Sequence, residues 1–413
     1  MTAQTIVILG GGVGGLVAAN ELARRLPRGH RIVLVERSAR HAFAPSFLWL
    51  MTGERRVEQI TRDLRALVRR GVEVVQAELL SIDVAAGRVD TDKGAIAYDH
   101  LVLALGAELA PETIPGLAEA ARTFYTLDGA ERLRSDLASF TGGSVAVVVS
   151  ALPYKCPGAP HEGAMLIGDF FRQRGLRGAV DLHLFTPEPQ PMPVAGPELG
   201  LAVQQLLERR GIGFHPSHQL TAVDPGTREL TFAGRPSVKY DLLVAIPPHR
   251  GPRLVREAGL TNEAGWVPVD RRTLATRHER VHAIGDVTAI PIPGRWRPDA
   301  PLMLPKAGVF AHGQALVVAR RIADEIAGRA AEQEFCGDGY CMLEAGDDLA
   351  GFAFGDFFAE PSPRIQLRRV GRAWHLGKLL FERWWLAPFG VRRRALELAL
   401  ELGGRAHGVP LTL

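Results

Sequence analysis

Residues 5–36 read TIVILGGGVGGLVAANELARRLPRGHRIVLVE, and this stretch decides the fold. An apolar, β-rich run is followed by a glycine-rich turn, a helical pattern and a second apolar run, which together predict a βαβ unit. The glycines fit the pattern G-x-G-x-x-G, and an acidic residue ends the second run about twenty residues later. This order predicts a dinucleotide-binding unit of a doubly wound α/β fold.

The residues of this turn have separate physical roles. Gly10 makes the turn, and Gly12, with Gly14 beside it, lets a pyrophosphate reach the amino end of the helix. Gly15 allows the helix to pack closely on the strand. Glu36 can accept hydrogen bonds from both ribose hydroxyls, and its charge would repel a 2′-phosphate. A plain strand–glycine–helix turn is the alternative, but the surrounding pattern favours a nucleotide site.

The composition limits the classes of protein to consider. The chain has 413 residues, a net charge of +4 and 46% hydrophobic residues, which is enough for two or three domains. Nearly all of the positive charge is arginine without an aromatic-interleaved basic stripe, so no nucleic-acid partner is expected. No apolar run reaches the ~18 residues of a membrane span, and no signal peptide is readable. Three cysteines do not form a secreted disulfide framework, and no metal site is predicted.

A second βαβ pattern begins at residue 145, but its turn lacks the glycines. The strand VAVVV is followed by Ser150 and then by LPYKCP at 152–157. None of these residues lets the backbone approach a pyrophosphate as glycine does. A cysteine therefore stands where a nicotinamide nucleotide would bind, and we expect electrons to enter at sulfur rather than from NAD(P)H.

Two further segments favour FAD as the cofactor of the first unit. They resemble the strand-end motifs of glutathione-reductase-like flavoproteins: YDHLVLALGA at 98–107 and VHAIGDV at 281–287. The resemblance implies that Gly106 and Ala107 pass close to FAD. It also implies that Asp286, after Gly285, hydrogen-bonds the ribityl chain. An acid after a glycine could instead cap a helix.

Segments along nearly the whole chain resemble the sulfide:quinone oxidoreductase family. They are FAPSFLW at 43–49, PYKCPGAPHE at 153–162, PEPQPMP at 187–193, IPPHRGP at 246–252, PKAGVFAHGQA at 305–315, GDGYCMLEAG at 337–346 and HLGKLLFERWWL at 375–386. The resemblance implies a pair of redox cysteines at Cys156 and Cys341. It also implies a glutamate near the first of them, Glu162, and a lysine close to the flavin, Lys306.

The chemistry of sulfide agrees with this choice of residues. Oxidising sulfide needs a sulfur carrier and a thiolate that returns electrons to the flavin, and one cysteine cannot easily do both. Lys155 would lower the pKa of Cys156 if it points toward the thiol. Glu162 could accept the proton of incoming HS⁻ or merely begin a helix, and both interpretations stay open. Lys306 near the flavin would stabilise the anionic reduced ring, and the less favoured alternative is a surface lysine.

The sequence also departs from the family. Many members carry a third cysteine early in the chain, where TFYTLDGA at 123–130 places Tyr125. Cys336 does not take that place and is interpreted as incidental. The quinone pocket of the family corresponds to Met342, Trp384 and Trp385, which replace other aromatic or aliphatic residues. A two-cysteine mechanism is therefore expected.

Residues 376–402 read as two amphipathic helices broken at 388–390. Tryptophans and an arginine cluster beside apolar helices suit a lipid headgroup layer. The alternative is a helical hairpin packed on the core or on a partner subunit. We expect a peripheral protein of the cytoplasmic membrane that contacts the membrane surface through these helices.

The predicted architecture is two Rossmann-like three-layer ββα domains and a C-terminal β/helical region. The expected bounds are 1–107 with 270–330 for the FAD domain, 108–269 for the second domain, and 331–413 for the quinone- and membrane-associating region. The predicted reaction is FAD-dependent oxidation of sulfide to sulfane sulfur, with ubiquinone or menaquinone as acceptor. Type II NADH:quinone oxidoreductase, the flavin subunit of a sulfide dehydrogenase and a non-enzymatic disulfide sensor are the alternatives; a homo-oligomer stays open.

Overall fold

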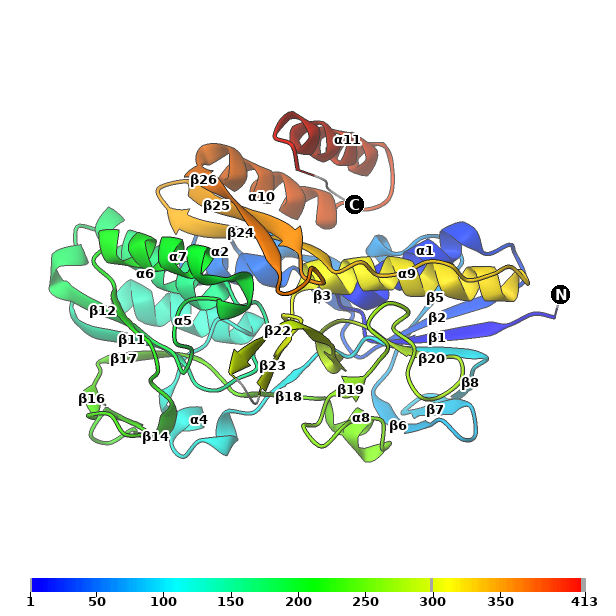
Figure 1. Cartoon of the computed structure of the whole chain (residues 1–413), viewed down its shortest axis with the longest axis horizontal. Helices are drawn as coiled ribbons and strands as arrows, with labels where there is room; N and C mark the ends of the chain where they lie inside the picture. The colour runs from blue at the N-terminus through cyan, green and yellow to red at the C-terminus, as the bar shows by residue number, and fades with distance from the viewer. Residues whose placement is uncertain (1, 298–299, 410–413) are drawn as a thin grey trace.

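The computed structural model describes residues 2–297 and 300–409. Two α/β bodies lie side by side, and the C-terminal sheet and helices lie across one side of both (Figure 1). Each body has a central parallel sheet with helices on one face and a small antiparallel sheet on the other. The fold is therefore the predicted α/β architecture with two Rossmann-like units.

The first body is built on a five-stranded parallel sheet. Its strands, in spatial order, are β20 (Val281–Ala283), β9 (His100–Leu103), β1 (Thr5–Leu9), β2 (Arg31–Glu36) and β5 (Val72–Gln76). Successive side chains of a strand point to opposite faces, so Ile6 and Ile8 meet α1 (Val13–Arg25) and α9 (Gly308–Ile326). Val7 and Leu9 face the sheet of β6 (Leu79–Asp83), β7 (Arg88–Thr91) and β8 (Gly94–Ala97). Burial on both faces explains the continuous apolar run of the sequence.

The second body repeats this plan with four parallel strands. They are β13 (Gly213–His215), β12 (Val180–Phe185), β11 (Gly143–Val149) and β17 (Leu242–Ile246). Helices α5 (Leu127–Ser139), α6 (Ala159–Gln173) and α7 (Pro197–Arg209) cover one face. The other face carries β14 (Leu220–Asp224), β15 (Glu229–Phe232), β16 (Val238–Lys239) and α4 (Leu117–Ala120).

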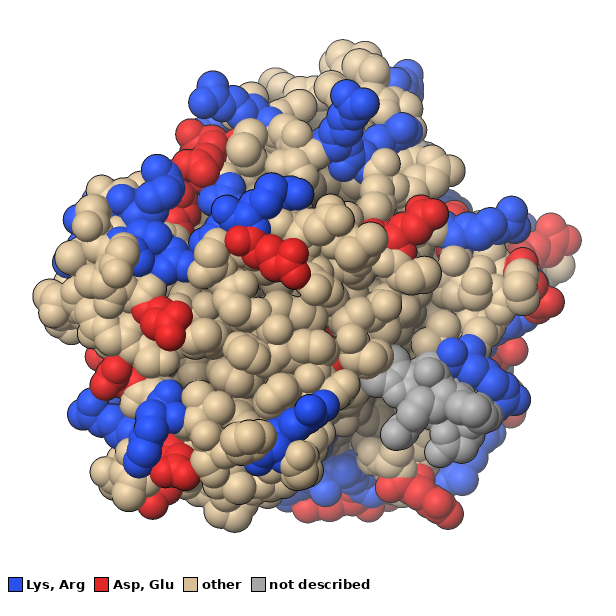
Figure 2. All heavy atoms as spheres, turned by 60° about the vertical axis from the view of Figure 1, so that its left-hand side comes forward, with Lys and Arg blue, Asp and Glu red and all other residues tan. Residues whose placement is uncertain are grey.

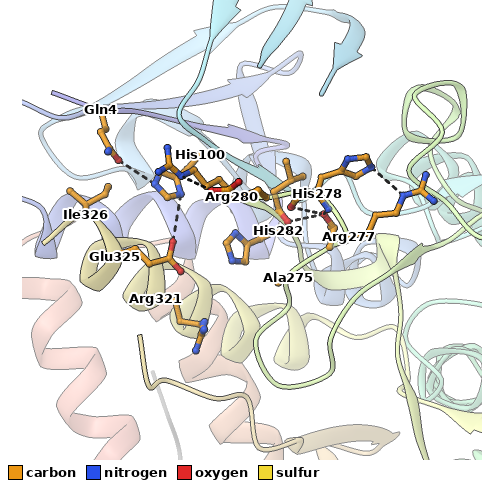
Figure 3. Close-up of a pocket in the computed structure, with 13 residues that line it drawn as sticks. Gln4, His100, Ala275, Arg277, His278, Arg280, His282, Arg321, Glu325 and Ile326 are labelled. Atoms are coloured by element: carbon orange, nitrogen blue, oxygen red, sulfur yellow. Dashed lines mark hydrogen bonds and ion pairs between the residues drawn. The ribbon is translucent and has the colours of Figure 1, made fainter. Parts of the chain in front are cut away.

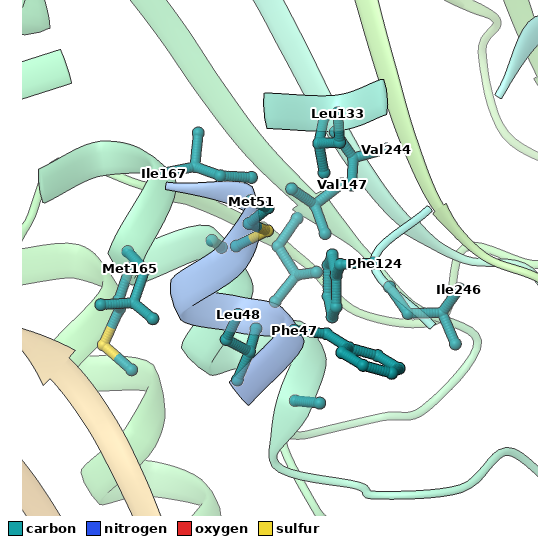
Figure 4. Packing of buried hydrophobic residues seen from close by; sticks show 14 of the residues in the cluster. Phe47, Leu48, Met51, Phe124, Leu133, Val147, Met165, Ile167, Val244 and Ile246 are labelled. Atoms are coloured by element: carbon teal, nitrogen blue, oxygen red, sulfur yellow. The ribbon is translucent and has the colours of Figure 1, made fainter. Parts of the chain in front are cut away.

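A short helix from the first part of the chain fixes the two bodies together. Helix α2 (Phe47–Met51) lies inside the core of the second body, where Phe47, Leu48 and Met51 pack among side chains of its helices and sheet (Figure 4). All of its residues are buried. Because a core this dense leaves no room for sliding, the segment on either side of α2 is held in place between the bodies.

The C-terminal region is a three-stranded antiparallel sheet followed by two helices. These are β24 (Asp338–Gly346), β25 (Leu349–Asp356), β26 (Arg364–Gly371), α10 (Arg372–Trp385) and α11 (Val391–Ala406). The break between the helices falls where the sequence predicts it, but the first helix begins earlier, at Arg372. Within the described ranges, no helix has the length and apolarity needed to cross a bilayer.

One expectation for these helices is wrong. Trp384 and Trp385 do not reach toward a lipid headgroup layer, because their exposed fractions are only 3% and 5%. They pack into the core of the first body, against Phe43 and Phe381. The sequence shows that α10 is amphipathic but not which of its faces meets the protein.

The remaining short elements connect these parts. They are β3 (Arg40–Ala42), α3 (Val57–Ile60), β4 (Thr61–Asp63), β10 (Glu108–Leu109), β18 (His249–Arg250), α8 (Arg253–Glu257), β19 (Val267–Pro268), β21 (Thr288–Ala289), β22 (Pro291–Arg297) and β23 (Ala300–Met303).

Candidate active site

The glycine turn between β1 and α1 has the shape that a pyrophosphate requires. Gly10 has a φ of +102°, and a Cβ on it would lie 2.5 Å from the carbonyl oxygen of Ala104. A Cβ on Gly15 would lie 1.8 Å from the carbonyl oxygen of Gly10, so helix and turn touch directly. A Cβ on Gly12 would meet nothing within 4 Å. The amino end of α1 is therefore open at the one glycine where a phosphate would approach.

The acidic residue that ends β2 reaches this same turn. Glu36 accepts hydrogen bonds from the backbone N–H groups of Gly11 (2.7 Å) and Ser38 (2.9 Å). His41, which the sequence did not single out, accepts a hydrogen bond at Nε2 from the indole N–H of Trp385 (2.8 Å). Because an indole nitrogen only donates, Nδ1 of His41 carries the proton and donates to the Gly11 oxygen (3.0 Å). Helix α10 is thereby connected to the dinucleotide turn.

The other predicted cofactor residues lie at the carboxyl ends of neighbouring strands. Gly106, with a φ of +71°, follows β9 and has open space where a side chain would be, and Ala107 comes directly after it. Asp286 follows β20 in a single helical turn, and its neighbour Gly285 donates to the Gln314 side chain (2.7 Å). Ligands of open α/β sheets bind at the carboxyl ends of the strands. These residues therefore fit FAD.

Lys306 is a buried residue rather than a surface lysine. Its Nζ donates to the carbonyl oxygens of Asp286 (2.7 Å) and Thr288 (3.0 Å) and lies 3.4 Å from the ring centroid of Trp266. Burial lowers its pKa to about 8, against the attraction of Asp286. Its backbone oxygen accepts the N–H of Cys156 (2.6 Å), so the cofactor side and the cysteine side of the site are in contact.

Two cysteines from distant parts of the chain meet at the amino end of α6. Cys156 ends the turn before α6 with a φ of +55°, and Cys341 lies on β24. A Cβ on Gly158 would lie 3.3 Å from Cys341 Sγ and 3.8 Å from Glu162 Oε2. Among the described residues, both cysteines are free thiols that are partly buried. Cys336 is exposed, and its thiol donates to the Glu334 carbonyl oxygen at 3.7 Å.

Burial dominates the electrostatics of the cysteine pair. It raises the pKa of Cys156 to about 12, and the carboxylate of Glu162 adds to the rise. The pKa of Cys341 is raised for the same two reasons. The cation that most opposes the shift at Cys156 is Lys378 rather than its neighbour Lys155. The charge of Lys155 acts on Asp286 and His249, and its effect on the Cys156 thiol stays a prediction.

Glu162 is the buried carboxylate of the site, with an exposed fraction of 3%. It lies in the first turn of α6, and its Oε1 accepts the backbone N–H of Glu344 (2.8 Å) and an ion-pair hydrogen bond from Lys378 Nζ. Burial lowers the pKa of Lys378, but the negative charges of Glu162 and Glu344 outweigh it, so the pKa lies above its ordinary value. The sequence did not single out Lys378, and the only hint of it was that lysine is rare in this chain.

Tyr125 stands at the position where the family resemblance led us to look for a third cysteine. Its ring is buried, and its hydroxyl donates to the carbonyl oxygens of Lys155 (3.0 Å) and Cys156 (3.4 Å). It also packs edge-on against His249, with ring centroids 5.6 Å apart. Tyr125 thus holds the backbone of the cysteine turn instead of supplying a thiol.

The place of a second nucleotide is filled by the chain's own side chains. After β12, the buried Glu188 corresponds to the acid that would bind a ribose, but its Oε2 accepts the hydroxyls of Tyr154 (2.8 Å) and Thr186 (3.1 Å). The amino end of α6 faces Cys341 instead of open space. The absence of a nicotinamide nucleotide site stays a prediction, and this filling supports it.

A cavity of about 580 Å³ lies away from these groups. It is lined by His100, His282, Arg321 and Glu325, among others, and opens at the amino ends of β9 and β20 (Figure 3). Neither cysteine of the pair lines it. Since chemistry in such folds is placed at the carboxyl ends of the strands, the cysteine pair rather than this cavity is the candidate active site.

The fold, the open glycine turn and the thiol pair define an FAD-dependent oxidoreductase. The chain belongs to the pyridine nucleotide-disulphide oxidoreductase family, which it matches over residues 4–307.

Within this family, the chain is similar to proteins named as sulfide:quinone oxidoreductases or sulfide-quinone reductases. The chain is 28% identical to the sulfide-quinone reductase of Aquifex aeolicus over 425 aligned residues, which cover 99% of this chain and 97% of that protein. It is 27% identical to the mitochondrial sulfide:quinone oxidoreductase of Mus musculus, covering 69% of this chain and 66% of that protein. The structure of the Aquifex aeolicus sulfide:quinone oxidoreductase superposes with a TM-score of 0.85 and 26% identity, over 97% of this chain and 95% of that one.

The two glycines of the turn give a matched pair of variants. Gly15→Ala should prevent the turn from closing, because its Cβ would overlap the Gly10 oxygen. Gly12→Ala meets no protein atom, so it should fold normally but crowd the pyrophosphate. We expect a low flavin content in both purified proteins, restored by excess FAD only in Gly12→Ala. Equal thermal midpoints for the two variants would contradict these roles.

Glu188 should make stability depend on pH. Burial raises its pKa to about 7, against the hydrogen bonds from Tyr154 and Thr186. A raised folded-state pKa stabilises the protein fully below the unfolded pKa, and this stabilisation is lost as pH rises through about 7. Between about pH 5 and pH 8 the wild type should lose roughly 3 kcal/mol more unfolding free energy than Glu188→Gln. Urea denaturation measures this difference, and the exposed Glu198→Gln is the control; parallel curves for wild type and Glu188→Gln would refute the assignment.

Proposed function

We propose that this protein oxidises sulfide at Cys156 and Cys341 and passes the electrons through FAD to a membrane quinone. The observation that carries this proposal is the approach of Cys341 to Gly158, two residues after Cys156, beside the buried Glu162 and at the turn where a second nucleotide would otherwise bind. The similarity to the Aquifex aeolicus enzyme, which extends over the C-terminal sheet and helices, supports it. Sulfide and quinone are named for those relatives and are proposed here.

The two thiols divide the sulfur chemistry. HS⁻ attacks the disulfide of the oxidised pair, and the S–S bond breaks. One cysteine then carries the new sulfane sulfur, while the other leaves as a thiolate that returns the electron pair to FAD. FAD supplies a two-electron acceptor beside them when it is bound. The amino end of α6 favours negative charge near Cys156 and Cys341, which offsets part of the burial that raises their pKa values. Glu162 is placed to take the proton of the incoming HS⁻.

Lys306 is proposed to act on the cofactor side. Its ammonium is held by two backbone carbonyls at the end of β20, beside Asp286. With a pKa of about 8 it is mostly charged at neutral pH, so it can stabilise negative charge that develops on a reduced ring. Asp286 and Glu36 are proposed to bind the ribityl chain and the ribose, respectively.

The proposed quinone site follows one face of α10. Met342 Sδ lies 4.0 Å from the Cβ position of Gly377, near the start of that helix. Trp384 lies seven residues further, which is about 10 Å along the same helical face, and Trp385 follows it. Because both tryptophans are buried, we propose that they form the inner wall of the pocket rather than its mouth.

The membrane face is proposed on the outer side of α10 and α11. Large apolar side chains there are strongly exposed: Leu376, Val391, Leu398 and Leu402. Arginine side chains lie among them, and Figure 2 shows basic residues on the upper part of the molecule, where Figure 1 places α11. An apolar and basic helical surface is typical of binding in the plane of an anionic membrane.

Type II NADH:quinone oxidoreductases share the fold, and one from Mycobacterium tuberculosis is 28% identical over 70% of this chain. The contact between Tyr154 and Glu188 argues against that function here, because it fills the position of the second nucleotide.

Replacing each cysteine separately tests the proposal. Cys156→Ala and Cys341→Ala should each lower sulfide-dependent quinone reduction by at least about 100-fold, while the flavin content stays at the wild-type level. Cys336→Ala is the matched control and should keep most activity, because that thiol is exposed and apart from the pair. An active Cys341→Ala enzyme would show that the second redox thiol is wrongly assigned.

Replacing exposed leucines of α11 by aspartate tests the proposed membrane face. Leu398→Asp with Leu402→Asp removes two side chains with exposed fractions of 56% and 54%. We expect at least a tenfold loss of cosedimentation with phosphatidylglycerol vesicles, since each buried leucine contributes about 2 kcal/mol. Leu201→Asp, equally exposed at 57% on α7, is the control. Unchanged vesicle binding by the double variant would assign α11 to packing or to a partner subunit.

A further inference from the structure

A buried ion cluster joins the cysteine pair to the surface. It begins at Glu162, next to Cys341, and continues through Lys378 on α10 to Glu344 on β24. Lys378 Nζ lies 4.0 Å from Glu344 Oε1, and Glu344 Oε2 lies 2.8 Å from His375 Nδ1. His375 Nε2 lies 3.7 Å from Asp348 Oδ1.

Exposure to solvent is found at the outer end of this series. Glu162, Lys378, Glu344 and His375 are all buried. Asp348, in the turn between β24 and β25, has a side-chain exposed fraction of 76%. The titratable groups therefore lead stepwise from the cysteines to bulk water.

The cluster is not a closed structural ion pair. Two buried carboxylates share the single ammonium of Lys378, so the cluster has a net charge of −1 when His375 is neutral. Glu344 Oε1 is buried and has no hydrogen-bond partner among the residues that the structure describes, an arrangement that costs free energy if its only purpose is stability. One additional proton on His375 or Glu344 would make the whole group neutral. Burial, for its part, raises the pKa of Glu344.

Other groups face this series from neighbouring elements. Trp49 on α2 packs edge-on against His375 (centroids 6.2 Å apart) and lies 5.4 Å from Lys378 Nζ. Arg55 also lies over the Trp49 ring, 4.8 Å from its centroid, and the exposed Glu54 interacts electrostatically with Glu344 and His375. The thiol of Cys341 interacts with Lys378. His375 and Asp348 continue the series of contacts from Glu344 to an exposed carboxylate.

We propose that Asp348, His375 and Glu344 form the path by which a solvent proton reaches the buried Lys378–Glu162 pair. The inference rests on the proposed function. In that reaction HS⁻, one proton and a quinone give sulfane sulfur and a quinol: the S–H bond breaks, a bond from that sulfur to a cysteine sulfur forms, and two electrons reach the quinone. The quinol holds two protons and HS⁻ supplies only one, so one proton must enter from solvent in each turnover.

His375 is the positioning and relay residue whose removal tests this path. His375→Gln keeps a side chain that can hydrogen-bond Glu344 but cannot carry a proton between two partners. In anaerobic stopped-flow mixing of the holoenzyme, reduction of the flavin by sulfide should stay within about twofold of wild type. Reoxidation by a water-soluble quinone should slow at least tenfold, show a larger solvent deuterium isotope effect, and recover on addition of imidazole to His375→Ala.

Two further variants keep the test decisive. Asp348→Asn is exposed and should fold, and we expect it to slow reoxidation about threefold, because water partly replaces the carboxylate. His407→Ala removes an exposed histidine of the same region, at the end of α11, and should change neither phase. Wild-type reoxidation in His375→Gln or in Asp348→Asn would overturn the path. If sulfide failed to reduce the wild-type flavin, the proposed function would fall instead.

Discussion

The carboxylate of Glu162 is the point at which three parts of the chain are held around the cysteines. It joins the first turn of α6 to the backbone of β24 at Glu344 and to the ammonium of Lys378 on α10. Removing one partner of a buried ion pair typically costs about 3–5 kcal/mol, because the other charge is left uncompensated in a dry environment. The C-terminal sheet and helix are therefore held against the second α/β body by the same group that stands beside Cys341.

The cysteine turn and a nucleotide-binding turn both place a negatively charged group at the amino end of a helix. In the first body the amino end of α1 is open at Gly12, where a pyrophosphate can approach. In the second body the amino end of α6 faces Cys341. There the Tyr154 hydroxyl donates a hydrogen bond to Glu188, the acid that could otherwise bind a ribose. A helix end that favours phosphate also favours a thiolate. One architecture thus provides a cofactor site in one body and a sulfur site in the other.

The parts of the molecule that the sequence predicted well are those determined by local pattern. The turn at Gly10–Gly15 could be predicted because only glycine fits its positive φ and its close contacts. The two sheets followed from apolar runs buried on both faces. Cys156 and Cys341 were chosen on family resemblance, and the structure brings them to one place, although their roles stay proposals.

The parts that the sequence missed depend on contacts between distant segments. Lys378 and Glu344 meet Glu162, and His375 meets Glu344, because α10 and β24 pack near the amino end of α6. His41 is joined to Trp385 where the other end of α10 packs on the first body. Adjacency in sequence pointed to Lys155 as the cation beside Cys156, whereas the influence of the distant Lys378 on that thiol becomes visible only in the fold.

The central claim is that electrons enter at the thiol pair and not from a nicotinamide. Its most direct test is to mix the FAD-loaded protein anaerobically with sulfide and, separately, with NADH or NADPH, and to follow the flavin absorbance. We predict that sulfide bleaches the flavin within seconds and that neither nicotinamide does so at a comparable rate. Rapid bleaching by NADH with none by sulfide would contradict the assignment of the cysteine pair as the site of electron entry.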